Sequence, residues 1–243
     1  MLPKIHSVWI GPRLGRLNAA CLKSFVNTGH DVTLHIYDRV EDVPDGVETS
    51  DANALYPADR LLQYPGGSYA ISANLIRYRI LAWGLGLYVD ADVYCWRPIE
   101  DADYIIGLEE NYDVNCAVMK LPVDCPALAE LNAIRDGWSP PWAGDAPVRR
   151  LNEYEWGTTG PRALTHYLQK HGLRHHARPI DAFYPVHHRQ TTLFTATDLT
   201  VDDLITSRTK YIHMYQSNLS RLFGGEPPPE SVAGQLITAA GID

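Results

Sequence analysis

Two carboxylates stand one residue apart inside an apolar run. The stretch "GLGLYVDADVYCW", residues 84–96, places Asp90 and Asp92 among Leu, Val and Tyr residues. Two half-buried like charges are costly unless a cation compensates them. Carboxylate oxygens suit Mg²⁺ or Mn²⁺, and a site with two carboxylates leaves coordination positions that phosphate oxygens commonly fill. The pair therefore predicts a divalent ion that carries a phosphorylated ligand, with a solvated turn as the alternative for so short a motif.

The element before this pair brings two further polar residues toward it. We predict a helix over residues 68–86, with Ser68 as its N-cap, and a strand directly after it. Asn74 and Arg77 are three residues apart and share one face of that helix. An Arg near a carboxylate–metal pair can hold a phosphate or a sugar hydroxyl, and a structural salt bridge is the alternative. On a strand, Asp90 and Asp92 would also share a face, and a bend at the C-terminal end of the strand would let both converge on one cation.

The remaining pattern predicts an α/β protein. Strand, helix and strand follow one another within residues 5–38, which favours a parallel sheet with helices on its faces. A long irregular connection over 39–67, rich in Pro and Gly, is expected to be functional. Further strands are expected at 104–109 and 115–121, and helices at 124–137 (capped by Asp124) and 158–172 (with Pro161 near its start).

Composition excludes several classes of protein. The 243 residues carry a net charge of −8, which argues against a protein that simply coats nucleic acid. The segment 149–189 is locally basic, with seven Lys or Arg against three acids. The four cysteines form no C-x-x-C pair, so neither a zinc nor a disulfide framework is supported. No signal peptide and no membrane-spanning run is visible, and we expect a cytoplasmic address.

With these residues in hand, the chain resembles a family of retaining glycosyltransferases that carry a D-x-D motif. This family includes capsular-polysaccharide, α-1,4-galactosyl and initiating mannosyl transferases, and the glucosylating clostridial toxins are distant relatives. The resemblance lies in five segments that occur in the family's order: "LPKIHSVWIG", "ANLIRYRILAWGLGLYVDADV", "VNCAVMKLPVDCPAL", "GTTGPRAL" and "YIHMYQSNL". It covers residues 3–120 well and 157–219 in patches.

The resemblance implies a fold and a domain division. The fold would be of the GT-A type, a Rossmann-like nucleotide-sugar-binding architecture with a mostly parallel central sheet flanked by helices. One domain would span residues 1–223, with a donor half to about 120 and an acceptor half from about 121. The rest, 224–243, is expected to be a loosely packed tail.

The resemblance also implies roles for individual residues. Asp92 would be the direct metal ligand, Asp90 would help to hold the metal and bridge to the donor, and His213 would be a third ligand or a diphosphate contact. Trp9 would stack on the nucleobase, and Arg77 and Tyr88 would contact the donor sugar or phosphate. The donor and acceptor cleft would be lined by Asn74, Asn115, the Thr159–Gly160 turn and Ser217. Asn74 departs from the family's acidic residue, which leaves the identity of the donor open.

The activity implied is a metal-dependent transfer of a sugar, with retention, from a nucleoside-diphosphate sugar to an acceptor hydroxyl. UDP is the preferred nucleotide, Mn²⁺ or Mg²⁺ the cofactor, and Asp90, Asp92 and Arg77 the catalytic group. A saccharide is the preferred acceptor, with a nucleic-acid base or a protein as minor alternatives. The size of the chain and its lack of an anchor suit a bacterial or phage enzyme.

Two other functions compete with this interpretation. One is a phosphohydrolase of the haloacid-dehalogenase type, which also places D-x-D after an apolar strand but expects a small residue where Tyr94 stands. The other is a sugar-binding module without catalysis.

Two aromatic groups of the second half are left with open roles. Six histidines within 166–188 fit no standard metal-ligand spacing, so we expect a polar surface, with a second metal site as the lesser alternative. Trp138, Trp142 and Trp156 are expected either to stack on an acceptor or to pack on one another.

Overall fold

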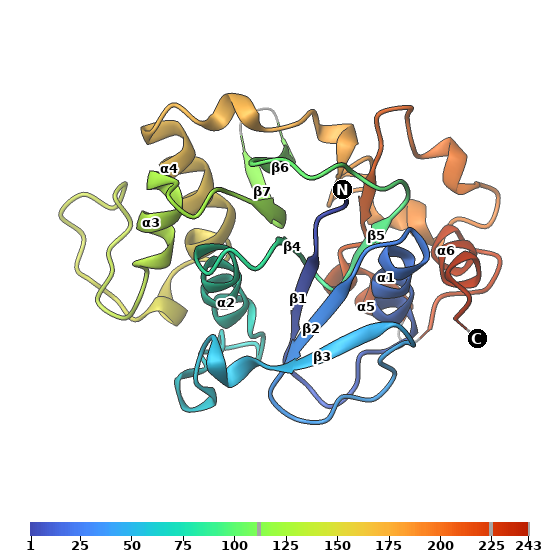
Figure 1. Ribbon diagram of the computed structural model, residues 1–243, viewed down its shortest axis with the longest axis horizontal. Coiled ribbons are helices and arrows are strands. Elements are labelled where there is room, and N and C mark those ends of the chain that lie inside the picture. The colour runs from blue at the N-terminus through green and yellow to red at the C-terminus, as the bar shows by residue number, and fades with distance from the viewer. Residues whose placement is uncertain (111–112, 224–225, 243) are drawn as a thin grey trace.

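A six-stranded sheet runs through the centre of the molecule (Figure 1). The computed structural model describes residues 1–110, 113–223 and 226–242. Across the sheet the strand order is β3-β2-β1-β4-β7-β6. The first four strands in this order pair in parallel, and β7 pairs antiparallel with both β4 and β6. The strands are β1 (Ile5–Trp9), β2 (Val32–Ile36), β3 (Val47–Asp51), β4 (Leu87–Val89), β6 (Ile105–Leu108) and β7 (Val114–Lys120).

Helices cover both faces of this sheet. Three of them pack in sequence against one another on one side: α2 (Ala70–Ala82), α3 (Pro126–Asn132) and α4 (Ala163–Lys170). On the other side lie α1 (Arg16–Asn27), α5 (Gln216–Phe223) and α6 (Val232–Ala240), and α1 contacts α6 (Figure 1). The predicted α/β class, with a mostly parallel central sheet flanked by helices, is confirmed.

The D-x-D pair lies in a turn rather than on a continuous strand. The expected strand over 87–93 is divided into β4, which belongs to the large sheet, and β5 (Val93–Cys95), which pairs antiparallel with β8 (Tyr211–His213) in a small second sheet. Asp90 and Asp92 occupy the bend between the two. The pairing of β5 with β8 places Val93 opposite His213, so a residue 120 positions later is brought beside the pair.

The helix α2 is buried on nearly all sides, as expected of a helix in the interior of an α/β protein. Its apolar residues Ile71, Leu75 and Tyr78 belong to the core, and Asn74 and Arg77 are buried as well. These two polar side chains therefore need partners inside the protein, because an unpaired buried polar group is costly.

A close backbone contact joins the residue before β4 to the residue before β1. At Gly86, φ is +156°, and a Cβ atom placed there would lie 2.4 Å from the backbone oxygen of Lys4. A side chain at this position would push β4 away from β1. This glycine thus fixes the start of the strand that ends at Asp90.

Several local predictions were wrong. The connection 39–67, expected to be irregular, contains the edge strand β3 and two short 3₁₀ turns. The N-cap of α2 is Tyr69 and that of α3 is Cys125, so neither Ser68 nor Asp124 caps its helix. The helix expected from 158 begins only at Ala163, because an irregular helical turn over 158–162, containing Pro161, precedes it.

The C-terminal segment differs from the loose tail that was expected. Residues 232–240 form α6, whose Ser231 side chain accepts a hydrogen bond from the backbone N–H of Gly234 and caps the helix. Leu236 and Ile237 are buried, and the Nδ2 of Asn27 on α1 donates to the oxygen of Ala240. Residues 224, 225 and 243 lie outside the described ranges. Among the helices that the structure describes, none combines the length and the apolar character that crossing a bilayer would require.

A buried histidine pair should make stability depend on pH. His6 and His35 lie on β1 and β2 with their ring nitrogens 3.0 Å apart, and burial lowers the pKa of His35 from 6.5 to about 4. Because the unfolded chain binds this proton first, stability is complete above pH 6.5 and is lost as the pH falls toward 4. We expect a loss on the order of 2 kcal/mol in the free energy of unfolding from this residue.

Urea titrations of the wild type and of His35→Gln across this pH range measure the effect. The variant should show a flatter pH dependence, while His175→Gln, at an exposed position, should match the wild type. If the free energy of unfolding changed equally with pH in the wild type and in His35→Gln, His35 would not be the source of the pH dependence.

Candidate active site

Asp90 is held from behind by two buried side chains. The Nη2 of Arg77 and the hydroxyl of Tyr88 both donate to its Oδ1, at 2.6 and 2.7 Å. Arg77 also donates through Nη1 to the backbone oxygen of Cys116 at 2.7 Å, and its guanidinium lies 4.6 Å from the centre of the Tyr88 ring. One carboxylate oxygen is thus fixed by the protein, and the 27% exposed side chain of Asp90 faces the cleft.

Asp92 is held by the segment that follows β8. Its Oδ2 accepts a hydrogen bond from the backbone N–H of Gln216 at 2.9 Å, and its Oδ1 lies 3.4 Å from the Nε2 of His213. Its backbone oxygen accepts from the N–H of Met214 at 2.8 Å. Between these contacts the chain turns at Tyr215, whose φ of +50° is uncommon outside glycine. Such strained residues cluster at functional sites, where surrounding contacts hold them in place.

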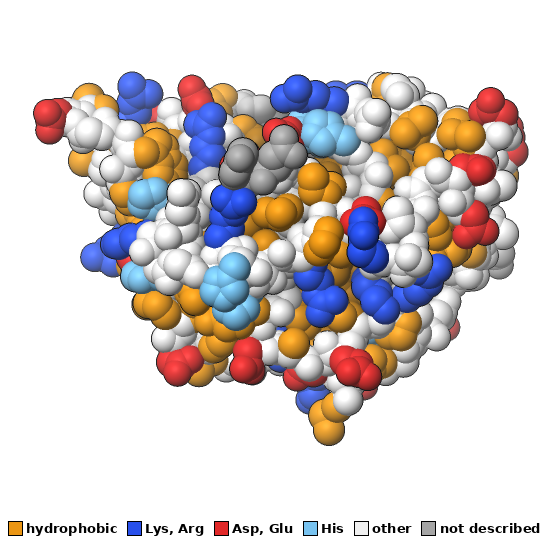
Figure 2. All heavy atoms as spheres, turned by 90° about the horizontal axis from the view of Figure 1, so that it is seen from above, with side chains coloured by type: hydrophobic (Ala, Val, Ile, Leu, Met, Phe, Trp, Pro, Cys, Tyr) orange, Lys and Arg blue, Asp and Glu red, His pale blue; other side chains and the backbone are white. Residues whose placement is uncertain are grey.

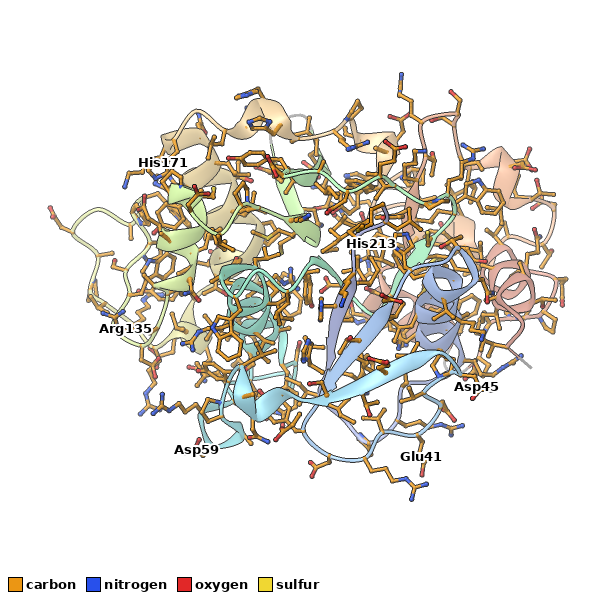
Figure 3. All side chains as sticks on the ribbon, viewed as in Figure 1. Glu41, Asp45, Asp59, Arg135, His171 and His213 are labelled. Atoms are coloured by element: carbon orange, nitrogen blue, oxygen red, sulfur yellow. The ribbon has the colours of Figure 1, made fainter. Side chains whose placement is uncertain are left out.

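Three predicted metal ligands meet at one point. Asp90, Asp92 and His213 each offer a ligand atom within 4.8 Å of the others. Figure 3 shows His213 near the middle of the molecule, where β8 and the main sheet approach. Two carboxylates and one imidazole are a donor set that suits Mn²⁺ and is compatible with Mg²⁺, so the residues present fit the ion that was predicted.

The charges of this group support one another. Burial alone would raise the pKa of Asp92, but His213 and the N–H of Gln216 outweigh it and leave that pKa below its ordinary value. Burial would likewise lower the pKa of His213, but the adjacent Asp92 raises it above 6.5. The pKa of the Tyr88 phenol is raised well above 10 by burial and by Asp90, which keeps its proton available for donation.

The group lines a cavity of about 600 Å³. One wall comes from α2 and the turn before α4, through Asn74, Arg77 and Gly157. The opposite wall comes from β8 and α5, through Tyr215, Asn218 and Arg221. A volume of this size lies within the range of sites that bind small molecules and cofactors.

A third carboxylate faces the same cavity. Glu109 follows β6, and its side chain is only 14% exposed. It accepts a hydrogen bond from the hydroxyl of Tyr215 at 2.9 Å, and the ring of Tyr215 lies 4.0 Å from that of His213. Burial and then Glu109 raise the pKa of the Tyr215 phenol, so this hydroxyl remains a donor.

The structure gathers most of the predicted site residues and leaves two aside. Asn74, Arg77, Asn115 and Ser217 line the cavity together with the three candidate metal ligands. Tyr88 is buried behind Asp90, and neither it nor Trp9 belongs to the lining found among the described residues. Trp9 ends β1 and packs on the core of the α1 side. Its contact with a nucleobase stays a prediction.

The predicted turn at 159–160 is fixed onto α2. The Nδ2 of Asn74 donates to the Oγ1 of Thr159 at 3.1 Å, and the hydroxyl of Tyr78 donates to the backbone oxygen of Thr159 at 2.7 Å. A Cβ atom on Gly160 would lie 2.9 Å from the amide nitrogen of Asn74. The turn therefore contacts Asn74 closely, and a side chain at position 160 would displace the Asn74 amide.

The three tryptophans lie in two different environments. Trp138 and Trp142 contact each other with ring centres 6.1 Å apart, so these two form a packing cluster. Trp156 lines the cavity, is 62% exposed, and lies 5.1 Å from the ring of Tyr64 on the same margin. Only Trp156 is placed to stack on a ligand in this cavity.

Several lining residues were not predicted. Tyr215 and Asn218 stand in the segment "YIHMYQSNL" but were given no role, while Glu109 and Arg221 lie outside the five segments of the resemblance. Glu109 is the last residue of the expected strand 104–109, and a carboxylate at the end of a strand was the one clue that could have identified it.

A second hollow of about 470 Å³ lies on the other side of α2 and is separate from the first. Its lining includes three arginines, Arg60, Arg79 and Arg135, and two acids, Asp59 and Asp136, above an apolar floor. Figure 3 places Arg135 and Asp59 at the periphery, away from His213. No group of His and acidic side chains able to hold a metal was found there among the described residues.

Comparisons with known proteins give a limited likeness. No protein-family model matches the chain, and no curated protein matches it. Among solved structures, one described as "PaToxG Glycosyltransferase" is 16% identical, with a TM-score of 0.48 over 70% of this chain and 70% of that chain. The function is therefore argued from the geometry of the cavity.

Proposed function

We propose that this chain is a metal-dependent glycosyltransferase that transfers a sugar, with retention of anomeric configuration, from a nucleoside-diphosphate sugar to an acceptor hydroxyl. UDP is the preferred nucleotide, Mn²⁺ or Mg²⁺ the preferred ion, and a saccharide the preferred acceptor. The observation that carries the proposal is the convergence of Asp90, Asp92 and His213 in a cavity of about 600 Å³.

The donor end of the site is built around these three ligands. A divalent ion held by them would act as a Lewis acid for the charge that develops on a diphosphate leaving group, which is worth several kcal/mol. Arg77 and Tyr88 orient Asp90 through one oxygen and leave the other oxygen free to face the cavity. The backbone N–H of Gln216 orients Asp92 in the same way. The protein thus fixes the carboxylates before any ligand arrives, which lowers the cost of reorganisation.

Neutral polar groups and one acid surround the position that a donor sugar would occupy. Asn74, Asn115 and Ser217 offer amide and hydroxyl groups that can donate to and accept from sugar hydroxyls. Glu109 adds a carboxylate on the side of β6. A carboxylate near an oxocarbenium-like transition state stabilises its positive charge. Asp90, Asp92 and Arg77 remain the proposed catalytic group.

The acceptor end is assigned to the margin formed by Tyr64 and Trp156. An exposed tryptophan beside a tyrosine offers apolar ring faces to a sugar ring, which favours a saccharide acceptor. The basic segment 149–189 keeps an anionic acceptor as the minor alternative. Part of the segment 149–189 runs along the top of Figure 1. Figure 2 shows this face from above: Lys and Arg side chains lie toward its middle, and most acidic side chains lie at its edge.

One experiment separates this proposal from its rivals. Thermal unfolding is measured with Mn²⁺ alone, with each of a panel of nucleoside-diphosphate sugars alone, and with both together. Two assays follow: release of nucleotide from the nucleoside-diphosphate sugars, and release of phosphate from an aryl phosphate. We expect a raised unfolding temperature only when metal and one donor are present together, followed by slow release of nucleotide. Hydrolysis of the aryl phosphate without any effect of donors would favour the phosphohydrolase. Donor binding without turnover, with saccharide acceptors present, would favour the binding module.

A further inference from the structure

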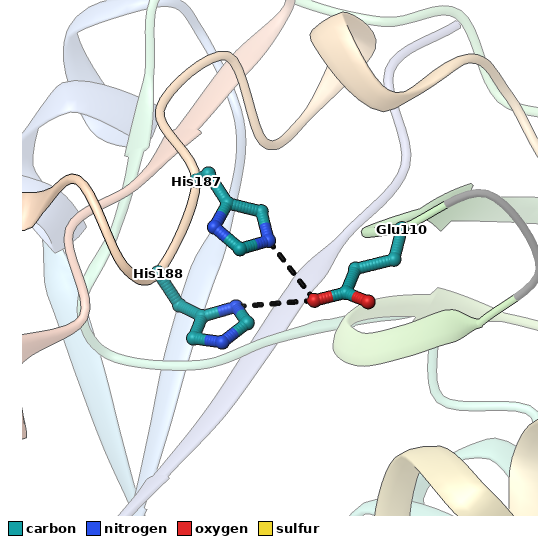
Figure 4. Close-up of side chains that lie close together, drawn as sticks. All are labelled: Glu110, His187 and His188. Atoms are coloured by element: carbon teal, nitrogen blue, oxygen red, sulfur yellow. Dashed lines mark hydrogen bonds and ion pairs between the residues drawn. The ribbon is translucent and has the colours of Figure 1, made fainter.

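A second group of metal-binding side chains lies at the margin of the cavity (Figure 4). Glu110, His187 and His188 each offer a ligand atom within 4.8 Å of the others. The Nε2 of His187 lies 3.0 Å from Oε1 of Glu110, and the Nδ1 of His188 lies 4.0 Å from the same oxygen. Glu109 adds a further carboxylate, with Oε1 3.7 Å from the Nδ1 of His188. Two imidazoles therefore face two carboxylates.

These separations match those around a tetrahedral transition-metal ion. Zinc binds imidazole nitrogen and carboxylate oxygen at 2.0–2.2 Å, so neighbouring ligand atoms of a tetrahedral site are about 3.4 Å apart. Glu110 Oε1 lies 3.0 Å from His187 Nε2 and 4.0 Å from His188 Nδ1, so its two separations lie on both sides of this value. Glu109 Oε1 lies 3.7 Å from His188 Nδ1. Rotation of these side chains toward a common ion would bring the separations closer to this value.

One nitrogen of the group lacks a partner. The Nδ1 of His188 is buried and makes no hydrogen bond among the described residues, because both of its carboxylate neighbours are too distant for one. A buried polar atom without a partner is uncommon and calls for an explanation such as an ion. The backbone oxygen of His188 accepts from the Nδ2 of Asn218 at 3.1 Å, which anchors this residue against α5.

We propose that Glu110, His187 and His188 form a site for a transition-metal ion of the zinc class, distinct from the site at Asp90 and Asp92. Imidazole ligands favour Zn²⁺ over Mg²⁺, whereas the carboxylate-rich first site favours the harder ions. Glu109 lies near enough to balance the charge of the bound ion. The fourth coordination position is left to water or to Glu109.

Binding requires two local changes. The imidazole of His187 now accepts, at Nδ1, a hydrogen bond from the backbone N–H of Arg189 at 3.2 Å. With a metal on Nε2, the proton of the neutral ring moves to Nδ1, so this contact must open. The guanidinium of Arg189 lies 3.9 Å from Glu110, and its side chain is 75% exposed, so it is free to turn toward solvent when the cation enters.

The chain contains a matched pair that should not bind. His175 and His176 are also adjacent, with ring centres 4.1 Å apart, as in the pair 187–188. Their rings contact Gly172 and Tyr104 rather than a carboxylate. If adjacent histidines alone were sufficient, both pairs would bind equally.

The test is calorimetric titration of Zn²⁺ into untagged, metal-free protein. It is made in an Asp92→Asn background so that the first site does not contribute. We expect one Zn²⁺ per chain, and at least about a tenfold weaker affinity in His187→Gln and in Glu110→Gln, with no change in His175→Gln. Replacement of Zn²⁺ by Co²⁺ should give the visible absorption of a four-coordinate ion, and His187→Gln should remove it.

Two results would overturn the proposal. One is the absence of stoichiometric Zn²⁺ binding in the Asp92→Asn protein. The other is equal affinity in His187→Gln, Glu110→Gln and His175→Gln, with circular dichroism showing that all three are folded; this would reduce the cluster to an ion pair. Because the readout is Zn²⁺ in a chain without Asp92, it is independent of any glycosyltransferase activity.

Discussion

Asp92→Asn is expected to abolish the stabilisation that Mn²⁺ and a nucleoside-diphosphate sugar would give together, and with it the release of nucleotide. The substitution removes the negative charge next to His213 but keeps a carbonyl oxygen that can accept from the N–H of Gln216. The turn into α5 should therefore survive while the ion is lost. Changes behind a metal ligand cost about 10–100-fold in affinity, so loss of a direct ligand should cost at least about a hundredfold.

Thermal unfolding with and without the metal and donor measures this effect, and a nucleotide-release assay supports it. Asp101→Asn is the matched control, because Asp101 pairs with Lys120 on the surface and surface ion pairs contribute little to stability. The control should respond to metal and donor as the wild type does. If Asp92→Asn is stabilised by metal and donor as fully as the wild type, Asp92 is not a metal ligand and the proposed site is wrong.

The sequence singled out Asp90, Asp92 and His213, which the structure brings together as candidate metal ligands, but it did not predict that the expected strand 87–93 divides into two. A continuous apolar run favoured one strand, because the residues before Asp90 and the residues after Asp92 are equally apolar and have equally high β-propensity. The structure turns at Asp90–Asp92, since β4 pairs with β1 while β5 pairs with β8. The carboxylates converge through this bend, and not through alternation along one strand. Pairing between distant segments decides such a bend, and no local pattern carries that information.

The remaining differences have the same origin. Asn74 and Arg77 were placed on one face by helical spacing alone, and this face does line the cavity. Glu109 and His188 are 79 positions apart, so only tertiary structure could bring them within 3.7 Å of each other. Likewise α6, which lies in the segment predicted as a loose tail, is ordered by burial of Leu236 and Ile237 against α1. Local signals thus predicted elements well and long-range contacts poorly.

Arg77→Met is expected to lower the free energy of unfolding by about 3 kcal/mol, because removing one partner leaves a buried charge without compensation. Arg77 is itself only 5% exposed, while Asp90 is 27% exposed, so the loss should lie at the lower end of the range for buried pairs. The backbone oxygen of Cys116 would also lose its donor. Arg77→Lys keeps the charge but cannot reach both acceptors, so it should lose about half as much.

Urea unfolding followed by circular dichroism gives these differences, and a Mn²⁺ titration in the presence of the nucleoside-diphosphate sugar gives a second readout. Because Arg77 fixes one oxygen of Asp90, both variants should also bind Mn²⁺ more weakly, and Arg77→Lys should do so while still folded. Arg221→Met provides the control, because Arg221 lines the same cavity but is exposed and lies in the last turn of α5. Its loss should change the free energy of unfolding by no more than about 0.5 kcal/mol. One outcome would contradict both roles of the ion pair behind Asp90, the structural and the positioning one. In that outcome Arg77→Met is as stable as Arg221→Met and binds Mn²⁺ as the wild type does.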